Sequence, residues 1–360
     1  MKFQTVIGVA GVIAGLVLPS YAKCPVNETT VLVIKAETGD IQVDTTGREA
    51  LVDVQADGGQ IHEACGKQTI EYTGSGARLW KVSTPKDIDL NLSTVGGTIT
   101  VMDVDGNVVA HTSGGSVTVG NIRGNASITT QGGSIKTGNI GGSAQMHTPG
   151  TIEVGDIGGN ADLHTTAGRI TTGIIAGMVA DAEAGRTISI SKAMEVQANT
   201  TSGDISIGEA ARIKAKSGGG HITSRKVHGP AQLRTEQGDI RLDSAGSWVE
   251  ASTGQGNILV HMSPENYESD LHMNLEAGVG DVTVYVPSRL RASIDATVQR
   301  PAVQSPGIFS EFPAAPNRPP QGLIPTNKYY GPSHSESFVN GGGNKIVLHT
   351  SLGKITIRKN

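Results

Sequence analysis

Aromatic residues are scarce in this chain of 360 residues, where Phe, Tyr and Trp together make up only 3%. A conventional globular core draws much of its buried area from such large side chains, so aliphatic residues must supply the packing here. Glycine is abundant instead, with 49 residues. The formal net charge is −4, and the sequence contains neither a basic stripe for nucleic acid nor a polybasic patch for a membrane surface.

Long apolar runs are also lacking, except at the N-terminus. Lys2 is followed by an uncharged apolar stretch from Val6 to Leu18, and Ser20-Tyr21-Ala22 then places small residues where a signal peptidase cleaves. The stretch is too short to cross a bilayer, so we predict a secretory signal over residues 1–22, cleaved after Ala22. An uncleaved anchor is the disfavoured alternative. The mature chain would have no transmembrane segment and would work in the periplasm, at the cell surface or outside the cell.

The sequence has only two cysteines, Cys24 and Cys65, and both lie near the predicted mature N-terminus. An even pair in an exported chain predicts one disulfide that holds the chain end against the first strands. Two free thiols are the alternative, and two cysteines alone are a poor basis for a metal site.

An internal repeat is the strongest signal in the sequence. An aliphatic residue, counted as position 1, recurs at intervals of 17 or 18 residues, and an eleventh copy follows after 24. A turn glycine stands two places before it in ten of the eleven copies, and Arg186 beside Gly185 is the exception. Positions 1, 3, 6, 10 and 12 are apolar, as Val117, Val119, Ile122, Ala126 and Ile128 show. This alternation predicts two short strands per copy, each with one buried face, whereas helical spacing never persists. The residues at position 1 are Ile99, Val117, Ile135, Ile152, Ile170, Ile188, Ile205, Ile222, Ile240, Ile258 and Val282.

One copy cannot bury its apolar edge alone, but copies stacked about 4.8 Å apart can. We therefore predict an all-β fold, a single-stranded parallel β-solenoid with 17–18 residues per coil. A right-handed winding is expected, because crossovers between parallel strands prefer that hand. Such narrow coils are expected to hold only Ile, Val, Leu and Ala. Glycine at position −1 is expected to supply backbone dihedral angles that other residues reach only with strain.

Both ends of the chain depart from the repeat and are expected to cap it. The predicted segments are N-terminal capping strands at 23–96, solenoid repeats at 97–298, a Pro-rich loop or lid at 299–335 and closing strands at 336–360. Leu90 and Leu92 are expected to be in register with positions 10 and 12. The charged C-terminal sequence IRKN is expected to lie at the open edge of the sheet and to block further pairing.

The repeat pattern GGSVTVGNIRG and the closing sequences GDVTVYVP and GGGNKIVLHTSLGKITIRKN resemble the bacterial putative-adhesin family. This family consists of secreted proteins with β-strand repeats and no assigned activity, and the resemblance covers essentially the whole mature chain. It implies a β-repeat fold and an adhesin role, and it transfers no catalytic residue.

Aspartates in the turns are the main candidates for catalysis, since polysaccharide lyases and hydrolases built on β-helices use clustered carboxylates. Asp204 and Asp239 lie two coils apart, with His221 between them. Their expected separation of about 10 Å is near the outer limit for a catalytic pair. A turn aspartate more often bonds nearby backbone, which favours a structural role. Asp40 and Asp281 occupy equivalent turns.

Histidines at position 13 are weak candidates for a metal site. His147 and His164 lie on adjacent coils, about 5 Å apart, and Asp162 at position 11 could be a third ligand. Position 13 also carries Thr, Asn, Lys and Arg in other copies, so a surface position that tolerates polar residues is favoured. The sequence therefore predicts no cofactor and no catalytic site.

Position 2 carries threonine or serine in most copies, which suits exposed strands and would also present hydroxyl groups to a glycan. The sequence thus favours a secreted, non-enzymatic binding or scaffold protein of adhesin or cell-envelope type, with a glycan or an envelope component as its partner. A polysaccharide-active lyase or hydrolase is the alternative. Specificity is expected at positions 2, 11 and 13 or in the Pro-rich segment.

Overall fold

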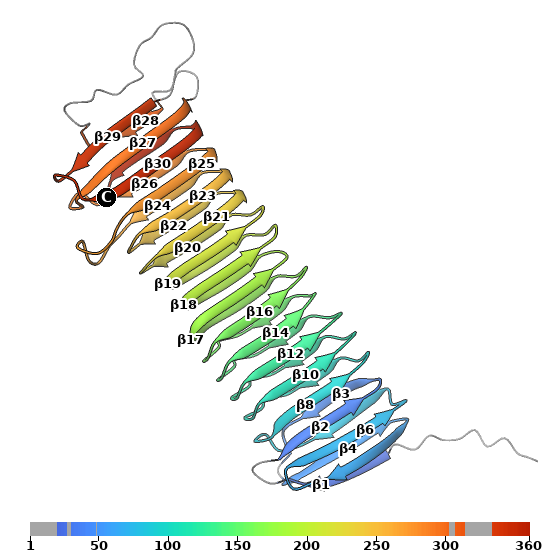
Figure 1. The fold of residues 1–360 in the computed structure, drawn as a ribbon. Helices are drawn as coiled ribbons and strands as arrows, with labels where there is room; N and C mark the ends of the chain where they lie inside the picture. The colour runs from blue at the N-terminus through green and yellow to red at the C-terminus, as the bar shows by residue number, and fades with distance from the viewer. Residues whose placement is uncertain (1–19, 27–29, 48, 302–306, 314–332) are drawn as a thin grey trace, which may run out of the picture.

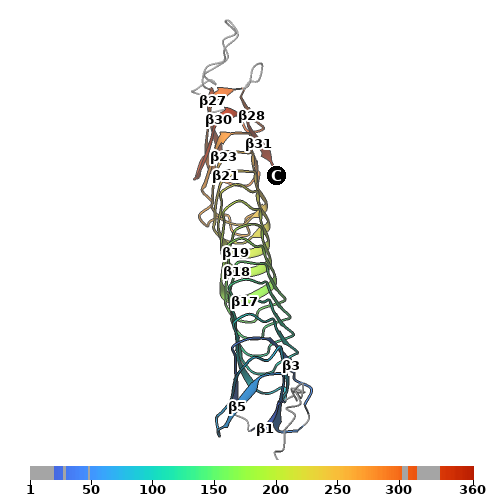
Figure 2. The same ribbon diagram turned by 90° about the vertical axis from the view of Figure 1, so that its right-hand side faces the viewer.

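The computed structural model describes residues 20–26, 30–47, 49–301, 307–313 and 333–360 as a long stack of β-coils (Figure 1). Among these residues, 31 strands join into one sheet, and none of the described residues forms a helix that could cross a membrane. The prediction of an all-β solenoid is therefore confirmed, while its right-handed winding stays a prediction. Most of the predicted signal and most of the Pro-rich segment lie outside the described residues. Figure 2 shows the stack from its narrow side.

Each central coil contains a three-residue strand, a single bridging residue and a five-residue strand. In one coil these are β11 (Val117–Val119), Ile122 and β12 (Ala126–Thr130). Parallel pairing with the next coil sets Val117 opposite Ile135, so the predicted period of 18 residues is the register of the stack. The other strands of this region are β9 (Ile99–Val101), β10 (Val108–Thr112), β13 (Ile135–Thr137), β14 (Ala144–Thr148), β15 (Ile152–Val154) and β16 (Ala161–Thr165).

From residue 170 onward the two strands of a coil merge and then separate again. The three merged strands turn the corner without a break, because their backbone pairing continues across it. They are β17 (Ile170–Ala184), β18 (Ile188–Thr200) and β19 (Ile205–Ser217). The strands that follow are β20 (Ile222–Val227), β21 (Ala231–Gln237), β22 (Ile240–Ala245), β23 (Val249–Gln255), β24 (Ile258–Met262), β25 (Met273–Val279) and β26 (Val282–Val286).

A column of buried hydroxyl groups at position 14 closes the coils. The Oγ1 atom of Thr130 donates to the carbonyl oxygen of Gly115 at 2.6 Å and accepts the N–H of Gly133 at 3.2 Å. Thr112 and Thr235 bond equivalent glycine carbonyl groups. These bonds satisfy polar atoms inside the stack, where an unpaired hydroxyl would be destabilising.

Glycine at position −1 is required by close approach of the stacked turns. A Cβ atom on Gly115 would lie 2.1 Å from the carbonyl oxygen of Gly97 in the neighbouring coil, where no methyl group fits. Among the repeats, a positive φ at this position occurs only in the later coils, beginning with Gly238. The expectation of strained dihedral angles was therefore wrong for the earlier coils, because it is the spacing between coils that excludes a side chain there.

The chain enters the stack out of sequence order at its N-terminal end. The first coil of the chain, formed by β2 and β3, is stacked between two later coils. On one side it pairs with β8 and β9, and on the other with β6 and β7. Beyond β6 and β7, β5 pairs antiparallel with β6, and β4 pairs antiparallel with β7. β1 pairs antiparallel with β4. The pairing of β8 with β10 confirms the expected register of Leu90 and Leu92. These strands are β1 (Ser20–Pro25), β2 (Val31–Ala36), β3 (Asp40–Asp44), β4 (Leu51–Asp57), β5 (Gln60–Cys65), β6 (Thr69–Ser75), β7 (Leu79–Ser83) and β8 (Asp89–Thr94).

This cap differs in its core from the repeats. Trp80 and Tyr72 are fully buried here, so the expectation that the coils hold only Ile, Val, Leu and Ala was wrong for the end of the stack. It was wrong in the repeats too, where Met146, Met262 and Met273 are buried. Gly74 makes room for the Trp80 ring, because a Cβ atom at position 74 would lie 2.8 Å from that ring.

A disulfide joins Cys24 of β1 to Cys65 of β5, with their Cα atoms 5.6 Å apart, as the sequence predicts. The bond ties together the two outer strands of the N-terminal cap. The predicted cleavage point after Ala22 falls within β1, and Cys24 is on the retained side.

The last coil in the sequence is not the last coil of the stack. β30 lies between β25 and β27, and β31 lies between β26 and β28. The expectation that the sequence IRKN blocks an open edge was wrong, because β31 has a partner on each side and β29 pairs antiparallel with β27 at the end (Figure 1). These strands are β27 (Ala292–Pro301), β28 (Ile308–Ser310), β29 (Ser333–Val339), β30 (Asn344–Gly353) and β31 (Ile355–Lys359).

Candidate binding face

The outward side chains at positions 11 and 13 form one continuous face along the stack, here called the polar face. Three shallow hollows, each lined by described residues, lie on this face or at its margin. Parallel pairing places each residue beside its equivalent in the next coil, so the face consists of two parallel rows. Position 11 contributes Val109, Ser127, Gln145, Asp162, Asp181, Gln197, Lys214, Gln232, Glu250 and Asn274. Position 13 contributes His111, Thr129, His147, His164, Glu183, Asn199, Lys216, Arg234, Ser252 and Glu276.

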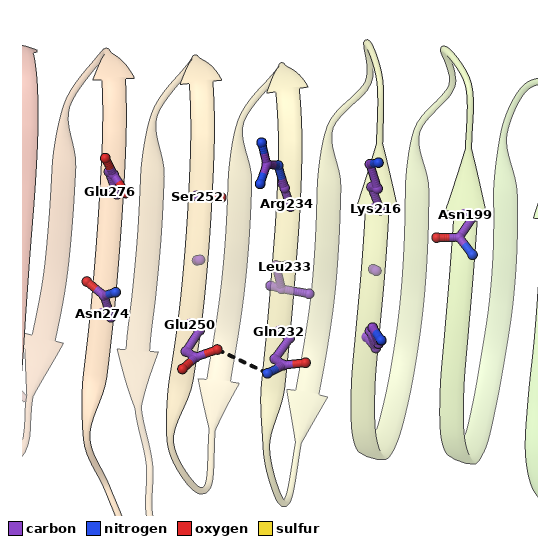
Figure 3. Close-up of a pocket in the computed structure, with 12 residues that line it drawn as sticks. Asn199, Lys216, Gln232, Leu233, Arg234, Glu250, Ser252, Asn274 and Glu276 are labelled. Atoms are coloured by element: carbon purple, nitrogen blue, oxygen red, sulfur yellow. Dashed lines mark hydrogen bonds between the residues drawn. The ribbon is translucent and has the colours of Figure 1, made fainter.

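The hollow shown in Figure 3 crosses strands β18, β19, β21, β23 and β25 and has a volume of about 420 Å³. Lys214 and Lys216 of β19 and Arg234 of β21 supply positive charge to it. The side chain of Gln232 donates to a carboxylate oxygen of Glu250 at 3.0 Å. We name the hollow, with its adjoining residues Gln197 and Trp248, the basic groove.

The adjoining hollow shares Lys214 and Gln232 with the first and adds an aromatic wall. Its volume is about 640 Å³, and Trp248 and Pro230 line it together with Gln197. The Trp248 ring stacks on His272, with ring centroids 5.1 Å apart. Because the two hollows share residues, they form one depression that leads from polar and charged side chains to an indole ring.

Acidic side chains gather on the other part of the polar face. Asp162 and Asp181 lie directly opposite each other, and both line a hollow of about 700 Å³. The pKa of Asp181 is raised, first because burial removes water from its carboxyl group and then because Asp162 and Glu183 are negatively charged. The three cations therefore have acidic side chains on both sides along the stack, since Glu250 and Glu276 also line the basic groove.

The weak metal candidates come together only in part. His147 and His164 stack with ring centroids 4.7 Å apart and planes 7° from parallel, which agrees with the expected spacing of about 5 Å. Their in-plane lone pairs run side by side and do not converge on one ion. His164 Nδ1 lies 3.0 Å from a Glu183 oxygen, and Asp162 accepts a hydrogen bond from Gln145 at 3.3 Å.

In the described part of the chain, Cys24, Glu63 and Cys65 bring three potential metal-ligand atoms close together. The two cysteines are joined in the disulfide, so their sulfur atoms are not free thiolates. The structure therefore adds no support to a metal centre in the described part of the chain.

The turn aspartates considered for catalysis accept hydrogen bonds from the backbone of the next coil. Asp204 accepts the N–H of His221 at 2.8 Å, and Asp239 accepts that of Asn257 at 2.6 Å. Between them, His221 Nδ1 accepts the N–H of Asp239 at 2.9 Å. Asp40 and Asp281 accept backbone N–H groups in the same way. These carboxylates hold successive coils in register.

Sequence reasoning missed two further ladders of this kind. At position 5, Asn121 Oδ1 accepts the N–H of Asn139 at 2.9 Å, and at position 9, Asn107 Oδ1 accepts that of Asn125 at 2.8 Å. The recurring Asn in these turns was the available signal. The basic groove was missed as well, since Lys216 and Arg234 were noted only as evidence that position 13 tolerates polar residues.

The class of protein defined by this fold is a parallel β-solenoid with one polar face. Comparison with solved structures gives a putative cell adhesion protein from Clostridium sporogenes, at 9% identity and a TM-score of 0.15, covering 95% of this chain and all of that one. It also gives a putative adhesin from Bacteroides fragilis, at 11% identity and a TM-score of 0.16, covering 95% of this chain and 97% of that one. No protein-family model matches the chain, and comparison with curated proteins gives no match.

Proposed function

We propose that the protein is an exported, non-enzymatic binding module of adhesin or cell-envelope type, and that the polar face is its binding surface. The observation that carries the proposal is the gathering of shallow hollows and exposed polar side chains on one face of a long stack. The inward and corner residues are committed to packing and to the ladders, whereas positions 11 and 13 vary from coil to coil. A flat surface of this kind suits an extended ligand.

Export is supported by two independent features. The predicted signal over residues 1–22 directs the chain out of the cytoplasm, and the disulfide between Cys24 and Cys65 is compatible with an oxidising compartment. The partner would then be a glycan or another component of a cell envelope.

The alternative, a polysaccharide lyase or hydrolase, has less support. Its leading carboxylates, Asp204 and Asp239, already accept backbone N–H groups of the next coil. A catalytic acid or base must reach a substrate to exchange a proton with it, whereas these carboxylates are held against the turn backbone by the N–H groups that they accept.

A glycan array and a pull-down from isolated cell envelopes test the proposal, using the mature chain with its disulfide formed. We expect retention of a glycan or an envelope component, and loss of it when Gln197 and Asn274 on the polar face are replaced by alanine. The matched control replaces Thr118 and Thr171 at position 2 by alanine and should leave binding intact. Failure of the mature chain to bind any glycan or envelope component would overturn the proposal.

A further inference from the structure

Three cations lie side by side in the basic groove. Lys216 of β19 is directly opposite Arg234 of β21, and Lys214 is two residues from Lys216 on the same face. Adjacent strands are about 4.8 Å apart and residues two apart along a strand about 7 Å, so the Cα atoms of the three residues lie within about 8 Å of each other. Like charges placed directly opposite on neighbouring strands destabilise a sheet.

No anion among the described residues forms an ion pair with this cluster. Within the described part of the chain, Lys214, Lys216 and Arg234 have neither an ion pair nor a side-chain hydrogen bond. Cations elsewhere on the same strands are paired, as Arg212 is with Glu195 at 3.5 Å. Glu250 of the neighbouring strand β23 lies opposite Gln232 and accepts the Gln232 amide. The repulsion is therefore retained in the free protein and would be relieved by an anion from outside.

The cations are bordered by groups that bind hydroxyls. Gln197 and Asn199 of β18 lie directly opposite Lys214 and Lys216, and Ser252 of β23 lies opposite Arg234. Amide and hydroxyl groups both donate and accept hydrogen bonds, as sugar hydroxyls do, whereas carboxylate and sulfate groups pair with Lys and Arg. In Figure 3 the labelled side chains of these strands lie in rows across the hollow.

We infer that the basic groove binds an acidic polysaccharide, with its carboxylate or sulfate groups between Lys214, Lys216 and Arg234. This inference rests on the proposed function and names its ligand class. The polymer would run along the stack, across the strands, because the groove extends over five of them and each coil repeats the spacing of its polar groups. Trp248 would offer an indole ring to the apolar face of a sugar.

The acidic part of the polar face limits where such a polymer lies. Asp181 and Glu183 of β17 are separated from Lys214 and Lys216 by the single strand β18. A polyanion would be repelled there, since the separation of about 10 Å is comparable with the screening length at physiological ionic strength. The polymer would therefore be centred on β19 and β21, since Glu250 of β23 and Glu276 of β25 place carboxylates on the other side of the three cations.

Titration of the mature protein with polygalacturonate, a sulfated dextran and neutral dextran tests this inference. We expect a polyanionic glycan to bind and neutral dextran not to. The preferred polymer distinguishes carboxylate from sulfate recognition. Replacing Lys214, Lys216 and Arg234 together by glutamine should raise the Kd by about tenfold or more, since charged groups at a binding surface contribute strongly.

The control replaces Arg169, Arg186 and Arg225, which lie exposed outside positions 11 and 13, by glutamine. This control variant loses the same three positive charges as the groove variant. Its Kd should change by less than about twofold, because surface charges distant from the groove are screened. Equal losses in both variants would overturn the groove assignment. Binding of double-stranded DNA or phosphatidylglycerol vesicles as tightly as the glycan would overturn the ligand class. Unchanged envelope binding by the groove variant would refute the groove and leave the proposed function intact, whereas no binding by the unmodified protein would refute both.

Discussion

Asp204 and His221 are joined across neighbouring coils, where the Oδ1 atom of Asp204 accepts the backbone N–H of His221 at 2.8 Å. The same position of the following coils continues the ladder, from His221 to Asp239 and from Asp239 to Asn257. A carboxylate, an imidazole and an amide thus perform one task, which is to accept an N–H group that points along the stack. What the position requires is an acceptor, and charge is not essential.

Asp204→Asn is therefore expected to preserve the fold, because the amide oxygen can still accept the N–H of His221. Asp204→Ala removes the acceptor and should reduce the free energy of unfolding by about 0.5–1.5 kcal/mol, the net contribution of a typical hydrogen bond whose donor can turn to water. Urea unfolding of the two variants measures the difference.

The same pair of variants separates the structural role from catalysis. If the unmodified protein releases reducing sugars or unsaturated products from acidic glycans and Asp204→Asn abolishes the release while retaining stability, the enzyme alternative is favoured. Asp239→Asn serves as the second test, since its carboxylate accepts the N–H of Asn257.

Adjacent glycines in one turn are expected to differ sharply in their tolerance of alanine. A Cβ atom on Gly115 would lie 2.1 Å from the carbonyl oxygen of Gly97, whereas one on Gly114 would have its nearest neighbour at 3.5 Å. Neither residue has a positive φ, so the comparison isolates the close approach of the coils.

Gly115→Ala should lower the free energy of unfolding by about 1–3 kcal/mol, as overpacking does, and Gly114→Ala should change it by less than about 0.5 kcal/mol. Thermal unfolding followed by circular dichroism compares them. Equal melting temperatures for the two variants would show that the coils separate easily at this turn, contrary to the expectation.

The interior of the repeats could be predicted from the sequence because it obeys one local rule. Each apolar residue lies on its equivalent in the next coil, so the spacing of Val117 and Ile135 gives the register directly. The order of the end coils breaks that rule. β31 follows β30 in the chain but is inserted between β26 and β28, and nothing in a periodic pattern specifies an insertion.

The candidate site was harder to predict for a related reason. The sequence indicated that positions 11 and 13 face outward, but the groove depends on five coils considered together. Lys214 and Lys216 are close in sequence, whereas Arg234 joins them only through the pairing of β19 with β21. The sequence also could not show that these cations lack an ion-pair partner among the described residues. Ion pairing depends on where side chains lie in the folded structure, which the spacing of residues along the chain does not give.

Removal of the disulfide is expected to loosen only the N-terminal cap. Cys24 and Cys65 lie 41 residues apart in the sequence and join β1 to β5 outside the parallel stack. Replacing both by serine should destabilise the cap by about 2–4 kcal/mol, the usual effect of closing a loop of this size. Hydrogen exchange should accelerate in β1, β4 and β5.

The central coils provide the internal control for this experiment, since each contacts mainly its neighbours in the stack. Amides of β12 and β14 should exchange at the same rate in the double variant and in the unmodified protein. Acceleration throughout the stack would show instead that the cap and the repeats unfold as one cooperative unit.

Asp181→Asn is expected to stabilise the protein at neutral pH. Burial and the negative charges of Asp162 and Glu183 raise the pKa of Asp181 above the 3.8 expected in an unfolded chain. As the pH rises through 3.8, the unfolded chain loses this proton first, so the contribution of Asp181 to stability falls until its folded-state pKa is passed. The amide of Asn does not ionise, so it avoids this loss and removes the repulsion between the facing carboxylates of Asp181 and Asp162. The free energy of unfolding should rise by up to about 1 kcal/mol.

Urea unfolding at neutral pH and again below 3.8 measures the effect, which should disappear at the lower pH because Asp181 is then protonated in both states. Asp156→Asn is the matched control, since Asp156 lies at an exposed corner and its Oδ1 atom accepts the N–H of Ile174 at 2.8 Å. The amide keeps that acceptor and has no opposing carboxylate to relieve, so no gain is expected. A gain for Asp181→Asn of the same size at both pH values would assign it to packing and rule out the opposed charges as its cause.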